Sequence, residues 1–311
     1  MPCYRPLKAY RTASGAVSFT ELRRDNVIQN LNLPCGQCVG CRLERSRQWA
    51  VRCMHEAQLH PHNSFVTLTY DDEHLPPHNS LRHRDFQLFI KRVRKALSKE
   101  TAAQHGGQAP HTPVLRYYMA GEYGETFHRP HYHACLFGID WDDKVLFSEN
   151  KGNRLYTSKT LTDLWGLGHA TTGELTFETA AYTARYVMKK VTGQRATFHY
   201  EITDPDTGEV IQRQAEYNKM SLKPGIGADW IKKYERDVYP QGKVVVRGHE
   251  SRAPKYYDKL HKRSNPDEHE ELQWTREKEG RSRAEHNTDA RLAVREKVAT
   301  AKLKQMKRTL Q

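Results

Sequence analysis

Short runs of apolar, β-branched and aromatic residues separate more polar segments along the chain. The run Phe65-Val-Thr-Leu-Thr-Tyr70 is rich in β-branched and aromatic residues, which is typical of a buried strand. Residues 114–122 and 131–137 show the same character and are separated by a short segment that contains glycine. We therefore predict two adjacent strands joined by a turn, and a further strand that ends at residues 175–177.

Other segments carry apolar residues at the helical period. The spacing predicts helices over residues 43–59, 86–97, 161–165 and 180–191, with Thr179 as the N-cap of the last. The apolar stripes that we expect to face the core are Leu43, Ala50, Cys53, Met54 and Ala57 in the first helix, Phe86, Phe89, Ile90, Val93 and Leu97 in the second, and Ala184, Val187, Met188 and Val191 in the last.

The remaining segments predict less regular structure. We expect the first forty residues to be irregular, residues 101–112 to form a loop, and residues 198–217 to form a hairpin around Asp204-Pro-Asp-Thr-Gly208. A tight turn at 224–227 and a short strand at 244–247 are also expected. Three regions follow: 1–60 as a cysteine-containing N-terminal segment and first helix packed on the core, 61–264 as the main domain, and 265–311 as a charged, weakly packed tail.

Strands that neighbour one another as hairpins, interrupted by helices, indicate an α+β fold. The pattern favours a central antiparallel sheet with helices packed on one face. No internal repeat is visible, and no stretch approaches the 18 apolar residues that a membrane-spanning helix requires.

Charge points to a polyanionic partner. The chain has 50 Lys and Arg against 37 Asp and Glu, a formal net charge of +13, and a pI of about 9.4. Nucleic acid is the commonest such partner, although a basic protein without one has the same composition. Basic residues gather on two predicted helices and could neutralise phosphates or simply form solvated faces: Arg42, Arg45, Arg47 and Arg52 on the first, and seven residues between Arg82 and Lys99 on the second.

The N-terminus and the cysteines indicate the compartment. The start, Met-Pro-Cys-Tyr-Arg-Pro, lacks the apolar core of a secretory signal. Six cysteines, several of them clustered, fit a reducing compartment better than a disulfide framework. We therefore expect a cytoplasmic protein.

Two histidines on one strand form a candidate metal site. His131 and His133 project to the same side of an extended strand, and Glu122, at the end of the preceding strand, is the natural third ligand. Glu125 in the turn competes with it, and His128 is a secondary candidate. An oxygen ligand with imidazoles beside a phosphate substrate favours Mg²⁺ or Mn²⁺. The alternative is a pair of ordinary strand histidines hydrogen-bonded to the core.

A pair of tyrosines follows about fifty residues later. Tyr182 and Tyr186 are four apart and therefore share a helix face, with Lys189 one turn further on. Tyrosine can form a covalent enzyme–phosphate bond, and nearby cations such as Lys189 offset the negative charge that develops during attack. Helical tyrosines more commonly pack a core, but here the apolar stripe already serves that purpose.

A third candidate site contains cysteines. Cys35, Cys38 and Cys41 have metal-binding spacing, and Cys3 could complete a four-thiolate structural zinc site. An iron–sulfur cluster and free thiols in a loop remain alternatives. Cys53 and Cys135 fall within a helix and a strand, where buried cysteines behave as small hydrophobes.

Taken together, these motifs resemble the HUH endonuclease superfamily, and more narrowly the replication initiation proteins of Microviridae of the gokushovirus branch. The similar segments are Phe65–Tyr70, His131-Tyr-His133, Tyr182-x-x-x-Tyr186-x-x-Lys189 and the segment Pro34–Trp49 around the cysteines. They span roughly residues 1–230, whereas the tail beyond residue 265 shows no such resemblance.

The resemblance implies a fold, a reaction and partners. The fold would be a central antiparallel sheet flanked by helices, with 61–264 as the nicking and joining domain. The protein would nick single-stranded DNA at the phage origin, hold the 5′ end on Tyr182 or Tyr186, and leave a 3′ hydroxyl to prime synthesis. No Gly-x-x-x-x-Gly-Lys-Ser/Thr motif is present, so a host helicase would unwind the DNA for the host polymerase in the bacterial cytoplasm.

Two other functions compete with this interpretation. One is a relaxase or transposase of the same superfamily, against which the cysteine segment and the double tyrosine argue. The other is a non-catalytic, zinc-stabilised DNA-binding protein in which His131 and Tyr182 are structural. Formation of a metal-dependent covalent DNA adduct separates the two classes.

Overall fold

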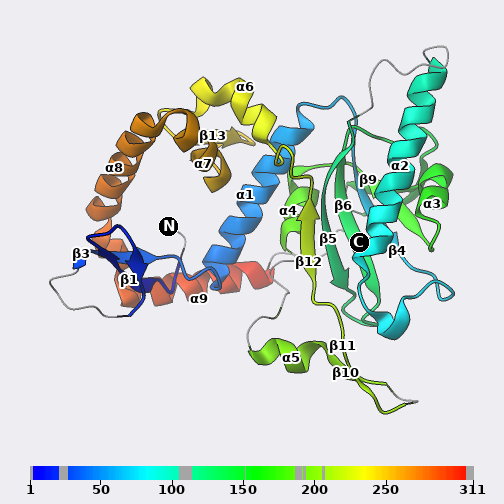
Figure 1. Cartoon of the computed structure of the whole chain (residues 1–311), viewed down its shortest axis with the longest axis horizontal. Helices are drawn as coiled ribbons and strands as arrows, with labels where there is room; N and C mark the ends of the chain where they lie inside the picture. Colours follow the sequence, from blue (N-terminus) through cyan, green and yellow to red (C-terminus); the bar gives the residue numbers. More distant parts are fainter. Residues whose placement is uncertain are drawn as a thin grey trace. The chain divides into compact units, whose positions relative to one another are not determined.

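A computed structural model describes residues 3–20, 27–104, 114–150, 152–185, 191, 194–204 and 207–305 of the chain. These residues form two compact units (Figure 1). One unit comprises the chain up to Arg47 together with the segment from His261 onward, and the other comprises Gln48–Leu260. The helix α1 (Val39–Ala57) contributes to both.

The larger unit is built on a seven-stranded sheet with the order β12-β5-β6-β4-β9-β8-β7, in which every neighbouring pair is antiparallel. Its strands are β4 (Asn63–Thr69), β5 (Arg116–Tyr123), β6 (Pro130–Phe137), β7 (Val145–Asn150), β8 (Asn153–Thr157), β9 (Ala170–Gly173) and β12 (Tyr217–Met220). The predicted α+β class with a central antiparallel sheet flanked by helices is confirmed.

Helices cover both faces of this sheet, so the narrower expectation of helices on one face was wrong. On one face, α2 (His83–Gln104) and α3 (Lys159–Trp165) pack against the alternate residues Leu68, Tyr132 and Ala134 of β4 and β6. On the other face, α4 (Phe177–Arg185) and the second half of α1 pack against the intervening residues, among them Phe65 and Cys135. Strand alternation therefore assigns each core to its own helices.

The predicted apolar stripes are confirmed in part, and Val187 and Met188 of the last stripe lie outside the described residues. Phe86, Phe89, Ile90 and Val93 of α2 are buried, and so are Ala50 and Cys53 of α1. Cys135 is also fully buried, as expected of a small hydrophobe in a strand. Residues 101–104, assigned to a loop by the sequence, continue α2 instead.

The rest of the larger unit consists of short elements. They are η2 (Pro77–Asn79), α5 (Gln194–Tyr200), the hairpin β10 (Glu201–Thr203) and β11 (Val210–Gln212), α6 (Ala228–Val238), the hairpin β13 (Lys243–Val246) and β14 (His249–Arg252), and most of α7 (Lys255–Ser264). A hairpin around Asp204–Gly208 and a strand near Val244 are present as predicted, but the hairpin is shorter than expected because residues 198–200 belong to α5.

The smaller unit holds a sheet that was not predicted. β1 (Leu7–Thr12), β2 (Val17–Ser18) and β3 (Val27–Leu33) form an antiparallel sheet of order β2-β1-β3, so the expectation of an irregular N-terminal segment was wrong. Few of its side chains are buried, Ala9 being one, which leaves a weak apolar pattern to detect in the sequence.

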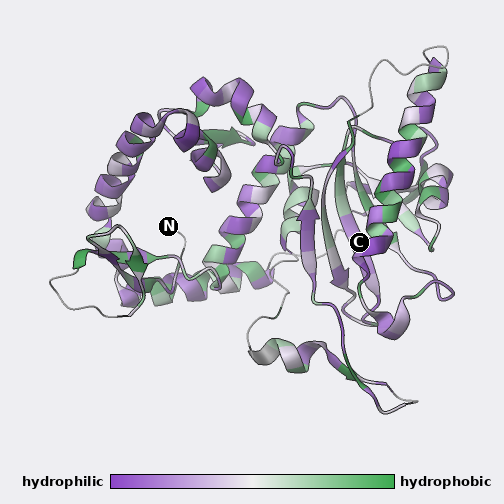
Figure 2. Cartoon of the chain, viewed as in Figure 1, coloured by the Kyte–Doolittle hydropathy of each residue, from purple (hydrophilic) through white to green (hydrophobic). Residues whose placement is uncertain are grey.

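The charged C-terminal segment forms helices in the same unit. These are α8 (Pro266–Ser282), η4 (Ala284–Asn287) and α9 (Asp289–Gln305), and Figure 2 shows that their residues are predominantly hydrophilic. Leu272 and Leu292 are buried, and Glu296 of α9 pairs with Arg5 at 2.9 Å. Among the described residues, none of the helices combines the length and the hydropathy that a membrane-spanning helix needs.

Candidate metal centre and tyrosine helix

Strands β5 and β6 bring the predicted metal ligands together. In their antiparallel register Glu122 lies directly opposite His131, and His133 follows two residues later on the same face. One ligand atom from each of these residues lies within 4.8 Å of the other two. Glu122 and His133 are buried, and His131 is half-buried.

The two imidazoles converge on one carboxylate oxygen. The Nε2 atoms of His131 and His133 lie 2.7 and 2.9 Å from Oε1 of Glu122. Burial by itself raises the pKa of Glu122, but the hydrogen bonds and positive charge of the two histidines outweigh it and lower the pKa to about 2. The carboxyl group is therefore ionised at neutral pH, as a metal ligand must be.

The opposite nitrogen of each ring is also engaged. Nδ1 of His133 lies 2.9 Å from Oγ1 of Thr67, and Nδ1 of His131 lies 3.2 Å from the carbonyl oxygen of Arg129. When Nδ1 carries the proton and donates it to one of these oxygens, the lone pair of Nε2 is available to bind a metal ion. The contacts at Nδ1 also hold the orientation of the ring. Sequence reasoning missed Thr67, whose signal was its place in the Phe65–Tyr70 motif.

The competing candidates in the turn lie elsewhere. Glu125 and His128 are exposed, and neither belongs to the cluster of metal-ligating groups found among the described residues. His128 also has a left-handed backbone conformation, with φ of 49°, as part of the turn that precedes β6. Strand register thus favours Glu122, which faces His131 across the ladder.

Helix α4 places Tyr182 against this cluster. The ring centroid of Tyr182 lies 5.1 Å from that of His133, with an interplanar angle of 78° between the two rings. It lies 6.4 Å from the ring centroid of Phe65. Ala180 and Ala184 are buried against the sheet, so the helix is held by its small residues while Tyr182 remains half-buried. Tyr186 and Lys189 lie outside the described residues.

The start of α4 differs from the prediction. The helix begins at Phe177, not after Thr179. Oγ1 of Thr176 accepts a hydrogen bond from the Thr179 amide, and Oγ1 of Thr179 accepts one from the Thr176 amide. This reciprocal cap satisfies two backbone donors, and it makes Thr176 the capping residue. The strand expected to end at 175–177 ends instead at Gly173.

The four predicted cysteines also come together, within the smaller unit. Their sulfur atoms all lie within 4.8 Å of one another, with Cys3 to Cys35 at 3.7 Å and Cys3 to Cys38 at 4.0 Å. Backbone amides of Tyr4, Cys35 and Cys38 donate to the sulfurs of Cys38, Cys3 and Cys35, each at 3.3 Å.

The thiols differ in acidity. Burial raises the pKa of Cys41 to about 12. For Cys38 burial also acts to raise the pKa, but hydrogen bonds from the Tyr4 and Cys41 amides and from neighbouring thiols outweigh it and lower the value to about 7. Hydrogen bonds that stabilise a thiolate are what a metal-binding cysteine requires.

Several of the arginines that the sequence offered as candidates for DNA contact have partners within the protein. The Arg52 guanidinium lies 3.9 Å from the ring centroid of Trp49 and 4.0 Å from that of Tyr256, and its Nε donates to the Ile226 carbonyl. Arg47 pairs with Glu44 at 2.6 Å. Arg92 donates to the carbonyls of Leu164 and Trp165 at 2.6 and 2.5 Å, and so ties α2 to α3.

Comparison with known proteins identifies the family. A family model described as replication-associated protein ORF2/G2P matches residues 63–191. Replication-associated protein VP4 of Bdellovibrio phage phiMH2K is 34% identical over 269 residues, which cover 86% of this chain and 79% of that protein. Replication-associated protein ORF2 of Spiroplasma virus 4 is 32% identical over 289 residues, covering 86% and 82%.

Replication-associated protein ORF4 of Chlamydia phage 1 is 30% identical over 236 residues, covering 73% of this chain and 53% of that protein. No solved structure matches. The resemblance to phage replication initiators is confirmed by relatives that match most of the chain, and the chain belongs to the family of phage replication-associated proteins.

Proposed function

We propose that this protein initiates rolling-circle replication of a single-stranded DNA phage by nicking origin DNA and later rejoining it. A replication role follows from the family, whose members named above are replication-associated proteins. The nicking chemistry is supported chiefly by one observation: Tyr182 lies against His133, in a cluster where two imidazoles and a buried carboxylate converge. A phenol beside a candidate metal centre is suited to phosphoryl transfer.

The cluster fits a divalent cation such as Mg²⁺ or Mn²⁺. Glu122 supplies an ionised oxygen ligand, and His131 and His133 supply Nε2 atoms whose rings are held from the Nδ1 side. When bound, the cation would act as a Lewis acid that polarises the scissile phosphate and offsets its developing charge. The cluster offers no thiolate for soft metals, and its carboxylate oxygen beside a phosphate substrate favours Mg²⁺ or Mn²⁺.

The proposed chemical step exchanges one phosphate ester for another. Oη of Tyr182 attacks the phosphorus, a Tyr–O–P bond forms, and the bond from phosphorus to the 3′ oxygen breaks. The phenol gives up its proton, the departing 3′ oxygen gains one, and the 5′ end remains attached to the protein. The free 3′ hydroxyl then primes synthesis.

The second tyrosine would complete the cycle. Tyr186 would cleave the regenerated origin after a round of synthesis, and the freed strand would be circularised by attack of its 3′ hydroxyl on the first phosphotyrosine. Lys189 would offset negative charge during both attacks. Host helicase and polymerase would act on the nicked DNA in the bacterial cytoplasm.

A covalent-capture experiment tests the proposal. Purified protein is incubated with labelled single-stranded phage origin DNA, with Mn²⁺ or with EDTA, and a denaturant-resistant adduct is sought. We expect a metal-dependent adduct that maps to Tyr182 or Tyr186, and its loss in the double variant Tyr182→Phe, Tyr186→Phe. Each single variant should retain partial activity. An adduct that persists in the double variant contradicts the tyrosine assignment.

The metal ligands are tested separately. His131→Ala and His133→Ala should remove cleavage while DNA binding largely survives, because the DNA-contacting charges remain. Normal cleavage by either variant rules out the metal centre as described. DNA that is bound but neither cut nor captured, across plausible origins and metals, would favour a non-catalytic DNA-binding protein. Capture of transposon or plasmid transfer sequences in place of phage origins would favour a transposase or relaxase of the same superfamily.

We also propose that the cysteine cluster holds a structural zinc ion. Four thiolates about 2.3 Å from one tetrahedral ion lie about 3.8 Å apart, which agrees with the 3.7 and 4.0 Å separations of Cys3 from Cys35 and Cys38. Thiolates on different irons of an iron–sulfur cluster lie on opposite sides of it and are further apart, so mutual approach within 4.8 Å favours a single ion.

Zinc would tie the start of the chain to the start of α1. Metal analysis of protein purified without chelator should show one zinc per chain, which the double variant Cys35→Ser, Cys38→Ser lacks. Because metal binding is coupled to folding, the variant should also unfold at a lower temperature. The double variant Cys53→Ala, Cys135→Ala is the control, and it should keep its zinc. Protein that contains no zinc and whose stability is unaffected by chelator indicates free thiols.

A further inference from the structure

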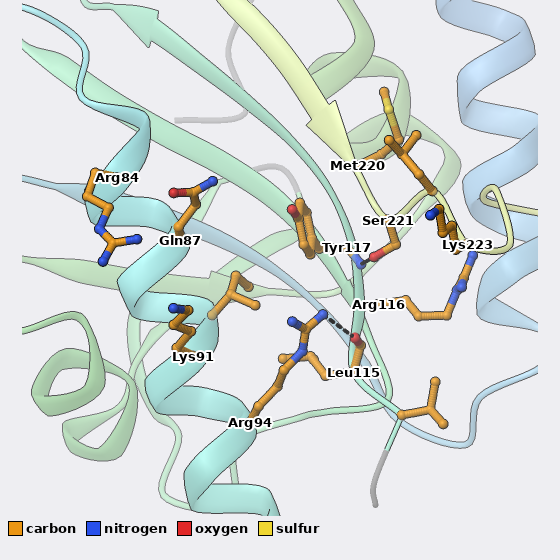
Figure 3. A pocket seen from close by; sticks show the side chains of 13 residues that line it. Arg84, Gln87, Lys91, Arg94, Leu115, Arg116, Tyr117, Met220, Ser221 and Lys223 are labelled. Carbon is orange, nitrogen blue, oxygen red and sulfur yellow. Dashed lines mark hydrogen bonds between the residues drawn. The ribbon is translucent and has the colours of Figure 1, made fainter.

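A basic groove runs along α2, in the same unit as the metal centre. It is a cavity of about 650 Å³ between α2, the start of β5 and the segment that follows β12 (Figure 3). The thirteen residues that line it include five with cationic side chains and no carboxylate. A concave surface of one charge concentrates the field and attracts polyanions.

One wall is a single face of α2. Arg84, Gln87, Lys91 and Arg94 follow one another at intervals of three, four and three residues, so they form one stripe, and all four are exposed. At 1.5 Å per residue the stripe is about 15 Å long. That length spans several successive phosphates of one DNA strand, whose charges recur about every 3.4 Å along the axis of a duplex.

The opposite wall adds the positive charge of Lys223 and contributes no carboxylate that could neutralise the stripe on α2. Arg116 also lines the groove, but its guanidinium is occupied by the buried carboxylate of Glu56 and by the Pro224 carbonyl. By contrast Arg84, Lys91 and Lys223 take part in no ion pair with another of the described residues. Nζ atoms without carboxylate partners are available for phosphate.

Contacts on the groove floor show which face of the sheet it occupies. Arg94 donates to the Leu115 carbonyl at 3.2 Å, as Figure 3 shows, and the Tyr117 ring packs edge-on against Phe86 of α2. Tyr118, the next residue in β5, is buried on the other side, in the cluster that also contains Phe65. Phe65 is the residue against which both His133 and Tyr182 pack. The groove and the metal centre therefore occupy opposite faces of one sheet.

We propose that this groove binds the phosphate backbone of a DNA segment that lies outside the nicked site. The choice of DNA as the partner rests on the proposed function. The groove itself takes no part in the nicking reaction. DNA held on both faces of the sheet would pass around its β12 edge, because the groove opens beside β12 and the residues that follow it. Binding here adds affinity and fixes the position of the origin without touching the reacting phosphate.

Two lysine pairs of equal charge allow a matched test. The double variant Lys91→Gln, Lys223→Gln removes one charge from each wall. Its control, Lys95→Gln, Lys99→Gln, removes two charges from exposed positions of the same helix that do not line the groove. Fluorescence anisotropy in EDTA measures binding of three probes: a short oligonucleotide with only the nick site, and the same oligonucleotide extended by single-stranded or by duplex DNA.

We expect the groove variant to bind an extended probe about tenfold more weakly than wild type near 150 mM salt, and the short probe equally well. The slope of log affinity against log salt should become less negative by about 1.4 for a single-stranded extension, or about 1.8 for a duplex one, because two phosphate contacts are lost. Whichever extension shows the change identifies the form of DNA held.

Equal losses in the groove and control variants, or no loss in either, overturn the proposal, as does an equal loss with the short probe. Because binding in EDTA requires no cleavage, failure of the covalent-capture experiment leaves this test intact. Conversely, both double variants should still form the covalent adduct with the short oligonucleotide if the nicking proposal is correct. Far-ultraviolet circular dichroism verifies that both variants are folded.

Discussion

Replacement of Thr67 by valine tests whether the first strand motif positions a metal ligand. Thr67 lies directly opposite His133 in the pairing of β4 with β6, and its hydroxyl lies 2.9 Å from Nδ1. Valine has nearly the same shape, so packing is preserved and only the hydrogen bond is lost. Loss of such a contact behind a ligating histidine typically weakens metal binding 10- to 100-fold.

For Thr67→Val we expect the smaller loss of metal affinity, about tenfold. His131 keeps its own support from the Arg129 carbonyl, and Thr67 is half-buried, so water can partly replace the lost hydroxyl. We therefore expect Mn²⁺ to bind Thr67→Val about tenfold more weakly, equivalent to about 1.4 kcal/mol. Isothermal titration measures this affinity directly, and the Mn²⁺ concentration that half-saturates nicking should rise by a similar factor.

Thr69→Val is the matched control. Thr69 lies on the same strand and the same face, but its hydroxyl donates to the His169 carbonyl at 3.1 Å and not to a candidate ligand. Both variants lose one hydrogen bond, worth about 1 kcal/mol of stability, so only metal affinity separates them. Unchanged Mn²⁺ affinity in Thr67→Val, or an equal loss in Thr69→Val, would refute the positioning role. Thr67→Ser should restore most of the affinity.

Two further predictions concern stability. Burial lowers the pKa of His55, stacked on Trp230 and 3.0 Å from the Tyr257 hydroxyl, to about 4 from its ordinary 6.5. The unfolded chain then binds more protons between these values, so the free energy of unfolding should fall by about 3 kcal/mol as the pH drops from 6.5 to 4. His55→Gln should flatten this dependence in urea titrations, and an unchanged pH dependence contradicts it. Gly168, with φ of 138°, leaves no room for a Cβ, which would lie 2.3 Å from the Asp71 amide nitrogen. Gly168→Ala should therefore lower the free energy of unfolding by at least about 2 kcal/mol. Gly280→Ala, which has open space around it, should not destabilise the protein. Thermal unfolding compares the two variants, and equal shifts in melting temperature would show that the structure relieves the clash at Gly168.

Much of the candidate site could be predicted from the sequence because its three candidate metal ligands are close to one another along the chain. His131 and His133 share a face through strand alternation, and Glu122 reaches them through a hairpin whose two strands are close in sequence. Chain connectivity limits the register of such a pair, so residue types and spacing were sufficient to assemble all three. The helix that carries Tyr182 was likewise predicted from its period, although its first residue was misplaced.

Other parts of the site depend on contacts between distant segments. Thr67 meets His133 only because β4 lies beside β6, and Cys3 reaches Cys35 only through the fold of its unit. The N-terminal sheet was missed because its short strands bury few side chains. Arg52 was one candidate for DNA contact, yet its guanidinium is engaged by the rings of Trp49 and Tyr256 and by the carbonyl of Ile226, which lies 174 positions away.

The fold class, the His131–His133–Glu122 cluster and the family could be predicted from the sequence, because they depend on periodicity and on near neighbours. Three features emerge only from the folded chain: the face of the sheet that each helix covers, the cations that lack a carboxylate partner, and the position of the groove along α2. Strand order and the partners of long side chains result from packing over the whole unit, and a one-dimensional pattern carries no direct record of those contacts.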